Sequence, residues 1–160
     1  MVYLMVCLSS PVWAGVHAAI ERHCTPLGLV PEVVRGVIET ESSSQALALG
    51  VQVRGVHRSY FPRHLVYAQA LLDRLLALTD NVGIGLMQVN WRAWKDRLDL
   101  SPHDLLDVDV NLRVGCHILQ QALLRHGVKT GIGAYHSPTP WRQRAYSRRV
   151  QGAIGHRKGR

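Results

Sequence analysis

The spacing of the apolar residues is the feature that most limits what this 160-residue chain can fold into. Leu, Val, Ile and Ala recur as they would on one side of a helix, and they seldom alternate with polar residues as on a strand. Residues 63–80 are the plainest case, because Leu65, Leu72, Leu75 and Leu76 fall on one side of a helix. The pattern predicts a mainly α protein, and the length suits one domain rather than two.

Prolines and glycines divide this pattern into segments. Helices are predicted over 15–24, from Pro31 to about 42, over 63–80, over about 111–126, and after Pro140. Gly127 is expected to end the fourth of these helices, and Ser101 to cap a short helical turn that precedes it. Valines alternate with polar residues in 45–62, so this insertion is either a small β-hairpin or an irregular loop. Two glycines two residues apart predict a loop or turn in the first half of 81–90.

The opening residues form an apolar run that ends in small residues, as before a signal-peptidase cut. The run is too short to span a bilayer as a helix. No Lys or Arg precedes it, so it is either an abbreviated signal or one with a misassigned start. We expect a signal peptide over 1–14, a domain over 15–150, a basic tail over 151–160, and export to the periplasm.

The chain has a formal charge of +8, from 19 Lys and Arg against 11 Asp and Glu. Such a charge attracts any polyanion, including nucleic acid, anionic lipid or an acidic cell-wall polymer, and does not choose among them. Much of it lies in 141–150 and 155–160, where a solvated basic tail is the simpler interpretation.

Three cysteines are present, of which Cys7 would leave with the signal. Cys24 and Cys116 would remain, either as a disulfide or as two buried thiols. The nine histidines offer no HExxH or CxxC spacing, and Cys116 and His117 are adjacent without a partner pair. The sequence therefore predicts no metal site and no cofactor.

The second predicted helix carries two glutamates one residue apart, and helical geometry separates them. Glu41 lies three residues after Ile38 and four after Val37, in the middle of the apolar face. Glu39 lies on the opposite side, where a solvated i,i+4 contact with Arg35 is expected. A carboxyl group on an apolar stripe loses water, which favours its protonated form and suits a general acid for a glycosidic oxygen. A buried, hydrogen-bonded structural carboxylate is the alternative from this helix alone.

Further motifs extend the pattern. Glu41-Ser42 is followed by "GIGLMQVN" at 83–90 and "GIGAYHSPTPWRQRAYSRRV" at 131–150. In order and spacing, about 30–150 resembles the lytic transglycosylases that have a goose-type-lysozyme-like (SLT) domain. More narrowly, it is similar to the small members that accompany conjugative-transfer, secretion or pilus systems. The resemblance implies a single lysozyme-like domain.

The resemblance also implies roles for individual residues. The catalytic acid/base falls on Glu41, and the residues expected to meet the saccharide are Ser42, Gly85, Leu86, Met87, Gln88, Asn90, Tyr135 and Tyr146. Leu86 and Met87 suit the core equally well, and Tyr146 is expected either to orient Glu41 or to pack at the surface. His136-Ser137-Pro138 stands where many relatives have Asn-Ala-Gly. The interval between Glu41 and Gly83 is longer than a minimal core needs, which suits a lid or a partner surface.

The implied reaction cleaves the β-1,4 bond between N-acetylmuramic acid and N-acetylglucosamine and yields a 1,6-anhydro product. It needs no cofactor and no second carboxylate, whereas Asp80 would be the residue to consider for hydrolysis. The implied partners are peptidoglycan glycan strands and components of an envelope-spanning conjugation, secretion or pilus machine, with the protein as a monomer and without nucleic acid.

Two other functions compete with this one. A small helical protein with a basic recognition helix in "PWRQRAYSRRVQ" would bind nucleic acid, although that interpretation leaves the leader, Glu41 and "GLMQVN" without a role. A scaffold at the envelope would use the same fold without catalysis.

Overall fold

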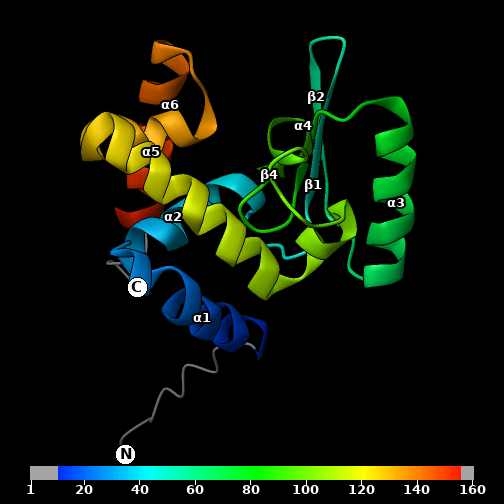
Figure 1. Ribbon diagram of the computed structural model, residues 1–160, viewed down its shortest axis with the longest axis horizontal. Coiled ribbons are helices and arrows are strands. Elements are labelled where there is room, and N and C mark those ends of the chain that lie inside the picture. The colour runs from blue at the N-terminus through cyan, green and yellow to red at the C-terminus, as the bar shows by residue number, and fades with distance from the viewer. Residues whose placement is uncertain (1–10, 156–160) are drawn as a thin grey trace, which may run out of the picture.

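The computed structural model describes residues 11–155, which are mainly helical with one small antiparallel sheet, confirming the prediction of a mainly α protein (Figure 1). The helices are α1 (Pro11–His23), α2 (Pro31–Ser42), α3 (Leu65–Leu78), α4 (Trp91–Trp94), α5 (Val108–His136) and α6 (Pro140–Gly155). The strands are β1 (Leu49–Val53), β2 (Val56–Tyr60), β3 (Val82–Ile84) and β4 (Val89–Asn90), and the 3-10 turns are η1 (Thr25–Leu27) and η2 (Pro102–Leu106). Within residues 11–155 no helix has the length and apolar character to cross a membrane.

The insertion after α2 is a β-hairpin, which settles the alternative left by the sequence. β1 and β2 pair antiparallel from Leu49↔Tyr60 to Val53↔Val56, and the two turn residues, Arg54 and Gly55, both have positive φ (49° and 81°). Such a pair of φ values is typical of the two-residue turns whose twist matches that of paired strands. β3 and β4 extend the sheet in the order β2-β1-β3-β4.

The loop or turn predicted for the first half of residues 81–90 is wrong, because residues 82–84 form β3. Gly83 pairs with Gly50 of β1, and a Cβ on either residue would come within 2.8 Å or 2.5 Å of the Gln88 side-chain oxygen. These glycines therefore make room for a side chain rather than a turn. The turn itself lies between β3 and β4, where Gly85 has a φ of 75°.

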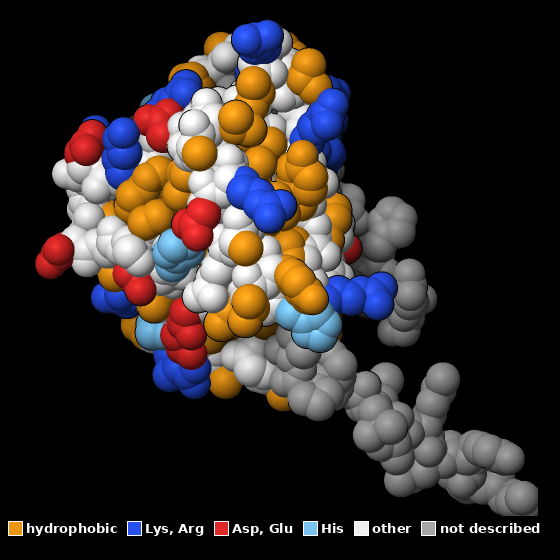
Figure 2. Space-filling view, turned by 90° about the vertical axis from the view of Figure 1, so that its right-hand side faces the viewer, with side chains coloured by type: hydrophobic (Ala, Val, Ile, Leu, Met, Phe, Trp, Pro, Cys, Tyr) orange, Lys and Arg blue, Asp and Glu red, His pale blue; other side chains and the backbone are white. Residues whose placement is uncertain are grey.

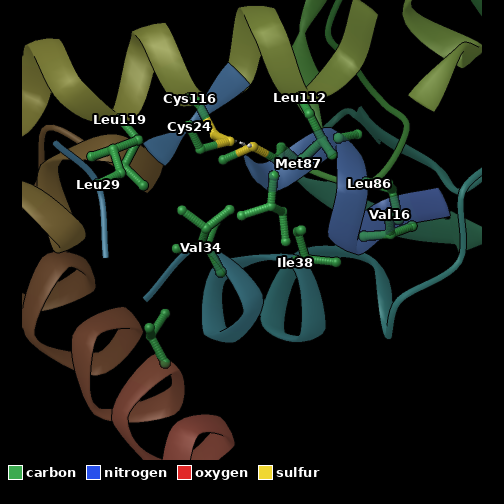
Figure 3. Packing of buried hydrophobic residues seen from close by; sticks show 14 of the residues in the cluster. Val16, Cys24, Leu29, Val34, Ile38, Leu86, Met87, Leu112, Cys116 and Leu119 are labelled. Atoms are coloured by element: carbon green, nitrogen blue, oxygen red, sulfur yellow. Dashed lines mark hydrogen bonds between the residues drawn. A yellow bond between two sulfur atoms is a disulfide. The ribbon is translucent and has the colours of Figure 1, made fainter. Parts of the chain in front are cut away.

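Two clusters of buried residues lie on either side of α5. One holds residues of α1, α2, α5 and α6, and the other joins the sheet to α3 and η2. Figure 3 shows the first cluster, with Met87 between Ile38 of α2 and the Cys24–Cys116 disulfide under α5. The disulfide has its Cα atoms 5.4 Å apart and joins residues 92 positions apart in the sequence. Of the two alternatives from the sequence, the structure has the bond.

The longest helix starts earlier and extends further than predicted. α5 begins at Val108, where the Asp107 side chain accepts a hydrogen bond from the Val110 N–H (3.0 Å), rather than at Asn111. Gly127 interrupts it as predicted (φ 72°, ψ 167°), but helical backbone resumes and reaches His136. Gly133 lies within this second part, where α5 passes close to α6. A Cβ on Gly133 would come within 2.6 Å of the Gln143 backbone, so a residue without a side chain is needed there.

The predicted domain boundaries fall inside helices. Residues 1–10, with Cys7, lie outside the described residues, and α1 begins at Pro11 rather than 15, so a cut after Ala14 would fall in its first turns. At the other end, α6 continues past 150 because Val150 and Ile154 pack on α2 at Gly36. Residues 156–160 of the predicted tail also lie outside the described residues.

The interval between α2 and β3 has an apolar outer surface. α3 packs on the sheet through buried Ala68, Leu72 and Leu75. Its opposite side exposes large apolar side chains, and Figure 2, which views the molecule from the α3 side, shows hydrophobic side chains gathered over this face. The exposed residues on or next to α3 are Phe61, Leu65, Val66, Tyr67 and Leu78.

Candidate active site

A groove of about 660 Å³ runs between the sheet and the last two helices. The sheet side presents polar side chains from β1, β2 and the β3–β4 region, among them Gln52, His57, Asn81, Gln88 and Asn90. The helical side is formed by the end of α5 and by α6, with Tyr135, His136, Trp141, Arg142 and Arg149. Glu41, from the last turn of α2, also lines the groove. Segments that are far apart in the sequence therefore share one open cleft.

Glu41 is recessed in this groove, and the prediction that separated it from Glu39 is confirmed. Its side chain is 11% exposed, whereas Glu39 is exposed to solvent. The predicted contact of Glu39 with Arg35 is wrong: Glu39 accepts a hydrogen bond from Ser44, and Arg35 lies 3.7 Å from Glu32. The left-handed backbone of Ser43 and Ser44, which follow the end of α2, places the Ser44 hydroxyl beside Glu39.

Glu41 is the single carboxylate among the described residues that line the groove. Its Oε1 lies 3.2 Å from Nδ1 of His136, a residue 95 positions later. His136 in turn stacks on Tyr146, with the ring centroids 4.4 Å apart and the planes 7° apart. The carboxylate, the imidazole and the phenol therefore form one contiguous group.

Two tyrosines complete this group, Tyr135, which is half-buried, and Tyr146, which is buried. The Tyr135 hydroxyl donates a hydrogen bond to the Met87 carbonyl oxygen (2.5 Å). Burial raises the pKa of Tyr135 well above its usual value, and the negative charge of Glu41 raises it further. Burial and then Glu41 likewise raise the pKa of Tyr146 well above its usual value. Both phenols therefore stay neutral at physiological pH.

Tyr146 is buried, 1% exposed, so the surface position considered from the sequence is wrong. Within residues 11–155 its hydroxyl meets no partner at hydrogen-bonding geometry. A side-chain hydrogen bond with Glu41 is nevertheless among the causes that raise the pKa of Tyr146, after burial and the charge of Glu41, so the hydroxyl lies within reach of the carboxylate that it was expected to orient. The Tyr146 hydroxyl is therefore a buried group next to the carboxylate.

Gln88 and Asn90 line the groove as predicted, but their amide groups are engaged within the protein. Gln88 Nε2 donates to the carbonyl oxygens of Ala48 (3.1 Å) and Gly85 (2.9 Å). Asn90 Nδ2 donates to Asn81 Oδ1 (2.8 Å), and its Oδ1 accepts from the backbone at the start of α4. Both side chains hold the groove wall in shape, and only the donors and acceptors that these internal hydrogen bonds leave unused can bind a ligand.

Five residues that were expected to meet the saccharide do not line the groove: buried Tyr146, described above, and four residues that lie behind the groove wall. The Ser42 side chain is buried and donates to the Ile38 carbonyl oxygen (2.9 Å). Leu86 and Met87 are buried in the core, which is the alternative considered from the sequence. Gly85 forms the tight turn behind them. Their contribution is to support the wall from inside.

Asn111 of α5 holds this turn in place, and the sequence interpretation missed its role. Its buried side chain accepts a hydrogen bond from the Met87 N–H (2.9 Å) and donates to the carbonyl oxygens of Ile84 and Leu105 (both 2.8 Å). A Cβ on Gly85 would come within 2.3 Å of the Asn111 amide nitrogen. The sequence feature that could have indicated this role is a single Asn between apolar residues near the start of a helix, and it was interpreted only as the first residue of that helix.

Asp80 does not line the groove. It forms ion pairs with Arg92 and with Lys95 (3.0 Å). Hydrogen bonds from Arg92 and then from Lys95 hold the pKa of Asp80 below its usual value. Its environment is that of an ionised structural carboxylate, so it supplies no second acid or base to the groove.

His57, His136, Trp141, Arg142 and Arg149 are groove residues that the sequence interpretation did not assign to the site. Only the three-dimensional fold brings these residues to the groove, because each lies far in sequence from Glu41 or in a segment that was interpreted as basic surface. No group of three or more His, Cys, Asp or Glu side chains in the described part of the chain is placed to hold a metal ion. In comparisons with known proteins, no family model, curated protein or solved structure matches the chain.

Proposed function

We propose that the protein is a peptidoglycan lytic transglycosylase, which cleaves the β-1,4 bond between N-acetylmuramic acid and N-acetylglucosamine. The observation that carries the proposal is the position of Glu41, the single carboxylate among the described groove residues, recessed beside His136 and two neutral tyrosines. An open groove lined by amides, aromatic rings and hydroxyl groups suits a saccharide chain. The motifs that resemble this enzyme class converge on the same carboxylate.

One carboxyl group accounts for the whole reaction. Protonated Glu41 gives its proton to the glycosidic oxygen as the bond from that oxygen to the muramoyl C1 breaks. The Glu41 carboxylate then takes the proton of the muramoyl C6 hydroxyl while O6 bonds to C1. The products are a 1,6-anhydromuramoyl end and a free 4-hydroxyl on N-acetylglucosamine, and Glu41 regains its proton without water entering the reaction.

The absence of a second groove carboxylate within residues 11–155 supports transglycosylation over hydrolysis. Most glycoside hydrolases place a second carboxylate about 5–5.5 Å or about 6.5–9.5 Å from the acid. Asp80 is held by Arg92 and Lys95 away from the groove and does not fill that role. Cyclisation needs only the substrate's own hydroxyl as nucleophile.

The neighbours of Glu41 suit its two roles. Tyr135 and Tyr146 stay neutral, so they bring no competing negative charge to the site. A His136 tautomer with hydrogen on Nδ1 donates to the ionised Glu41, which orients the carboxylate for the second step. Stacking on Tyr146 fixes the plane of that imidazole.

Action in the periplasm follows from the same proposal. A disulfide between Cys24 and Cys116 is typical of an oxidising compartment, which supports export. There the enzyme would open the cell wall locally for a conjugation, secretion or pilus apparatus. It would act as a monomer on glycan strands, with components of that machine as its protein partners.

The test uses purified protein and peptidoglycan sacculi, with the soluble products identified by mass spectrometry. We expect anhydro-muropeptides from the parent and from Glu39→Gln, and none from Glu41→Gln. Glu39→Gln is the matched control because it makes the same chemical change, loss of one carboxylate, on the exposed side of the same helix. Equal loss in both variants would contradict the assignment of the acid.

Other products identify other functions. Reducing ends in place of anhydro ends would indicate a hydrolase. No soluble products from the parent would leave a scaffold or a nucleic-acid-binding module. A salt-sensitive DNA complex that persists in Glu41→Gln would point to the latter.

A further inference from the structure

The groove has one strongly basic wall, formed by α6. Residues 140–155 of this helix contain four arginines and no acidic residue. Arg142 and Arg149 line the groove, seven residues apart on one side of the helix, whereas Arg144 and Arg148 do not line it. At a rise of about 1.5 Å per residue, Arg142 and Arg149 lie roughly 10 Å apart along the axis of α6.

Neither Arg142 nor Arg149 forms an ion pair with a carboxylate in residues 11–155. Instead each lies over an aromatic ring, Arg142 over Trp141 at 5.2 Å and Arg149 over Tyr146 at 5.5 Å from the guanidinium carbon to the ring centroid. Such stacking keeps the planar guanidinium in place while its N–H donors remain open to a ligand. The wall is therefore cationic, with each guanidinium group over an aromatic ring.

In a peptide-bearing strand the polysaccharide backbone gives this wall little to bind, because its hydroxyl and acetamido groups are neutral and the lactyl carboxyl group of each muramoyl residue is held in the amide bond to the stem peptide. Peptidoglycan also carries stem peptides on its muramoyl residues, and these peptides bring free carboxylates. A guanidinium binds a carboxylate through two parallel hydrogen bonds, a geometry that neutral sugar groups do not match. Charge complementarity thus points to the peptide rather than to the glycan.

We propose that Arg142 and Arg149 form a carboxylate-binding wall through which the groove selects glycan strands that carry acidic stem peptides. The inference rests on the proposed function and specifies its substrate. Both arginines are exposed, so each contact contributes at most about a fivefold gain in affinity. The pair should favour peptide-bearing strands over peptide-free strands by roughly tenfold.

General attraction to a protein of charge +8 is the effect that must be separated from this wall. Arg144 and Arg148 provide the matched control, because they lie on the same helix, are exposed and carry the same charge, but do not line the groove. Arg144→Gln/Arg148→Gln and Arg142→Gln/Arg149→Gln lower the net charge equally. A difference between the two double variants reports position rather than charge.

The experiment measures binding of full-length Glu41→Gln protein to labelled, soluble glycan oligomers in three forms. The first carries acidic stem peptides, and the second carries the same peptides with their carboxylates amidated. In the third an amidase has removed the peptides, and the lactyl carboxylates that this step frees on the muramoyl residues have then been amidated, so that the strand carries no negative charge. We expect roughly tenfold tighter binding of the acidic form, loss of that preference in Arg142→Gln/Arg149→Gln, and its retention in Arg144→Gln/Arg148→Gln. Circular dichroism verifies that each variant is folded.

Equal affinity for the three forms would overturn the inference, and so would an equal loss in both double variants. Tight binding of the amidated form would also overturn it, because the peptide body rather than its carboxylates would then be recognised. Cleavage by the parent protein is measured separately on peptide-free strands. If anhydro products form but the binding preference is absent, the proposed function stands and the inference about the arginines fails. If the preference is present but no cleavage occurs, the arginines bind the peptides and the proposed function fails.

Discussion

Reduction of the Cys24–Cys116 disulfide should lower the stability of the protein by a large and calculable amount. Both cysteines are fully buried, and the bond closes a loop across 92 sequence positions between the end of α1 and the middle of α5. The chain-entropy relation for a loop of this length gives about 4.6 kcal/mol, and removal of native disulfides typically costs about 2–5 kcal/mol. For a chain of this size, about 2–4 °C per kcal/mol converts 4.6 kcal/mol into a fall in Tm of roughly 9–18 °C.

The assay is thermal unfolding followed by circular dichroism, with and without a phosphine reductant. The parent for this experiment carries Cys7→Ser, so that the third thiol takes no part in exchange. Alkylation and mass spectrometry count the free thiols before and after reduction. Cys24→Ala/Cys116→Ala is the control, since its Tm should not respond to reductant at all.

Two results would refute the reasoning. Free thiols on both cysteines in the folded, unreduced protein would show that the bond does not form. Complete reduction with a change in Tm below about 2 °C would show that the bond does not restrict the unfolded chain as the loop length requires.

Three further predictions concern the residues that hold the structure together. Asn111→Leu removes the partners of three buried backbone groups, so the free energy of unfolding in urea should fall by about 3–6 kcal/mol; an unchanged midpoint would contradict the role given to this side chain. Gly85→Ala requires positive φ and crowds Asn111, so it should also destabilise the protein, whereas a neutral result would mean that the turn moves freely. Hydrogen bonds from Arg22 and then His23 lower the folded-state pKa of Asp109, so its contribution to stability is present above about pH 3.9 and is lost as the pH falls through the lower folded value. Asp109→Asn should therefore flatten the dependence of stability on pH below about pH 3.9, and parallel curves for parent and variant would exclude the contribution.

Local pattern was enough to predict the helices and the face on which Glu41 lies. In α2, the packing of Val37 and Ile38 on the core follows directly from their spacing, and it carries Glu41 with them. A helix face is a local property, since 3.6 residues per turn fix it whatever the partner. The same reasoning could not tell that Glu39 would bind Ser44 rather than Arg35, because that contact depends on the backbone after the helix ends.

The glycines show where local reasoning stops. Gly83 and Gly133 look alike in sequence, each in a G-x-G pair, and the pair that contains Gly83 was interpreted as a loop or turn. In the structure one lies in a strand under the Gln88 side chain and the other in a helix against α6. What each glycine accommodates comes from another part of the chain, so its role could not be derived from its own segment.

The groove depends on the same distant contacts, and α5 is the element that brings them together. Its first turn binds the β3–β4 turn through Asn111, its middle is joined to α1 at Cys116, and its end places Tyr135 against the Met87 carbonyl oxygen and His136 against Glu41. The break at Gly127 separates the two anchors from the residues at the site. Because Tyr135 ties the second part of α5 to the same turn that Asn111 holds, the position of His136 does not rely on the disulfide alone. Reduction should therefore weaken the fold as a whole while leaving the group around Glu41 intact in the molecules that remain folded.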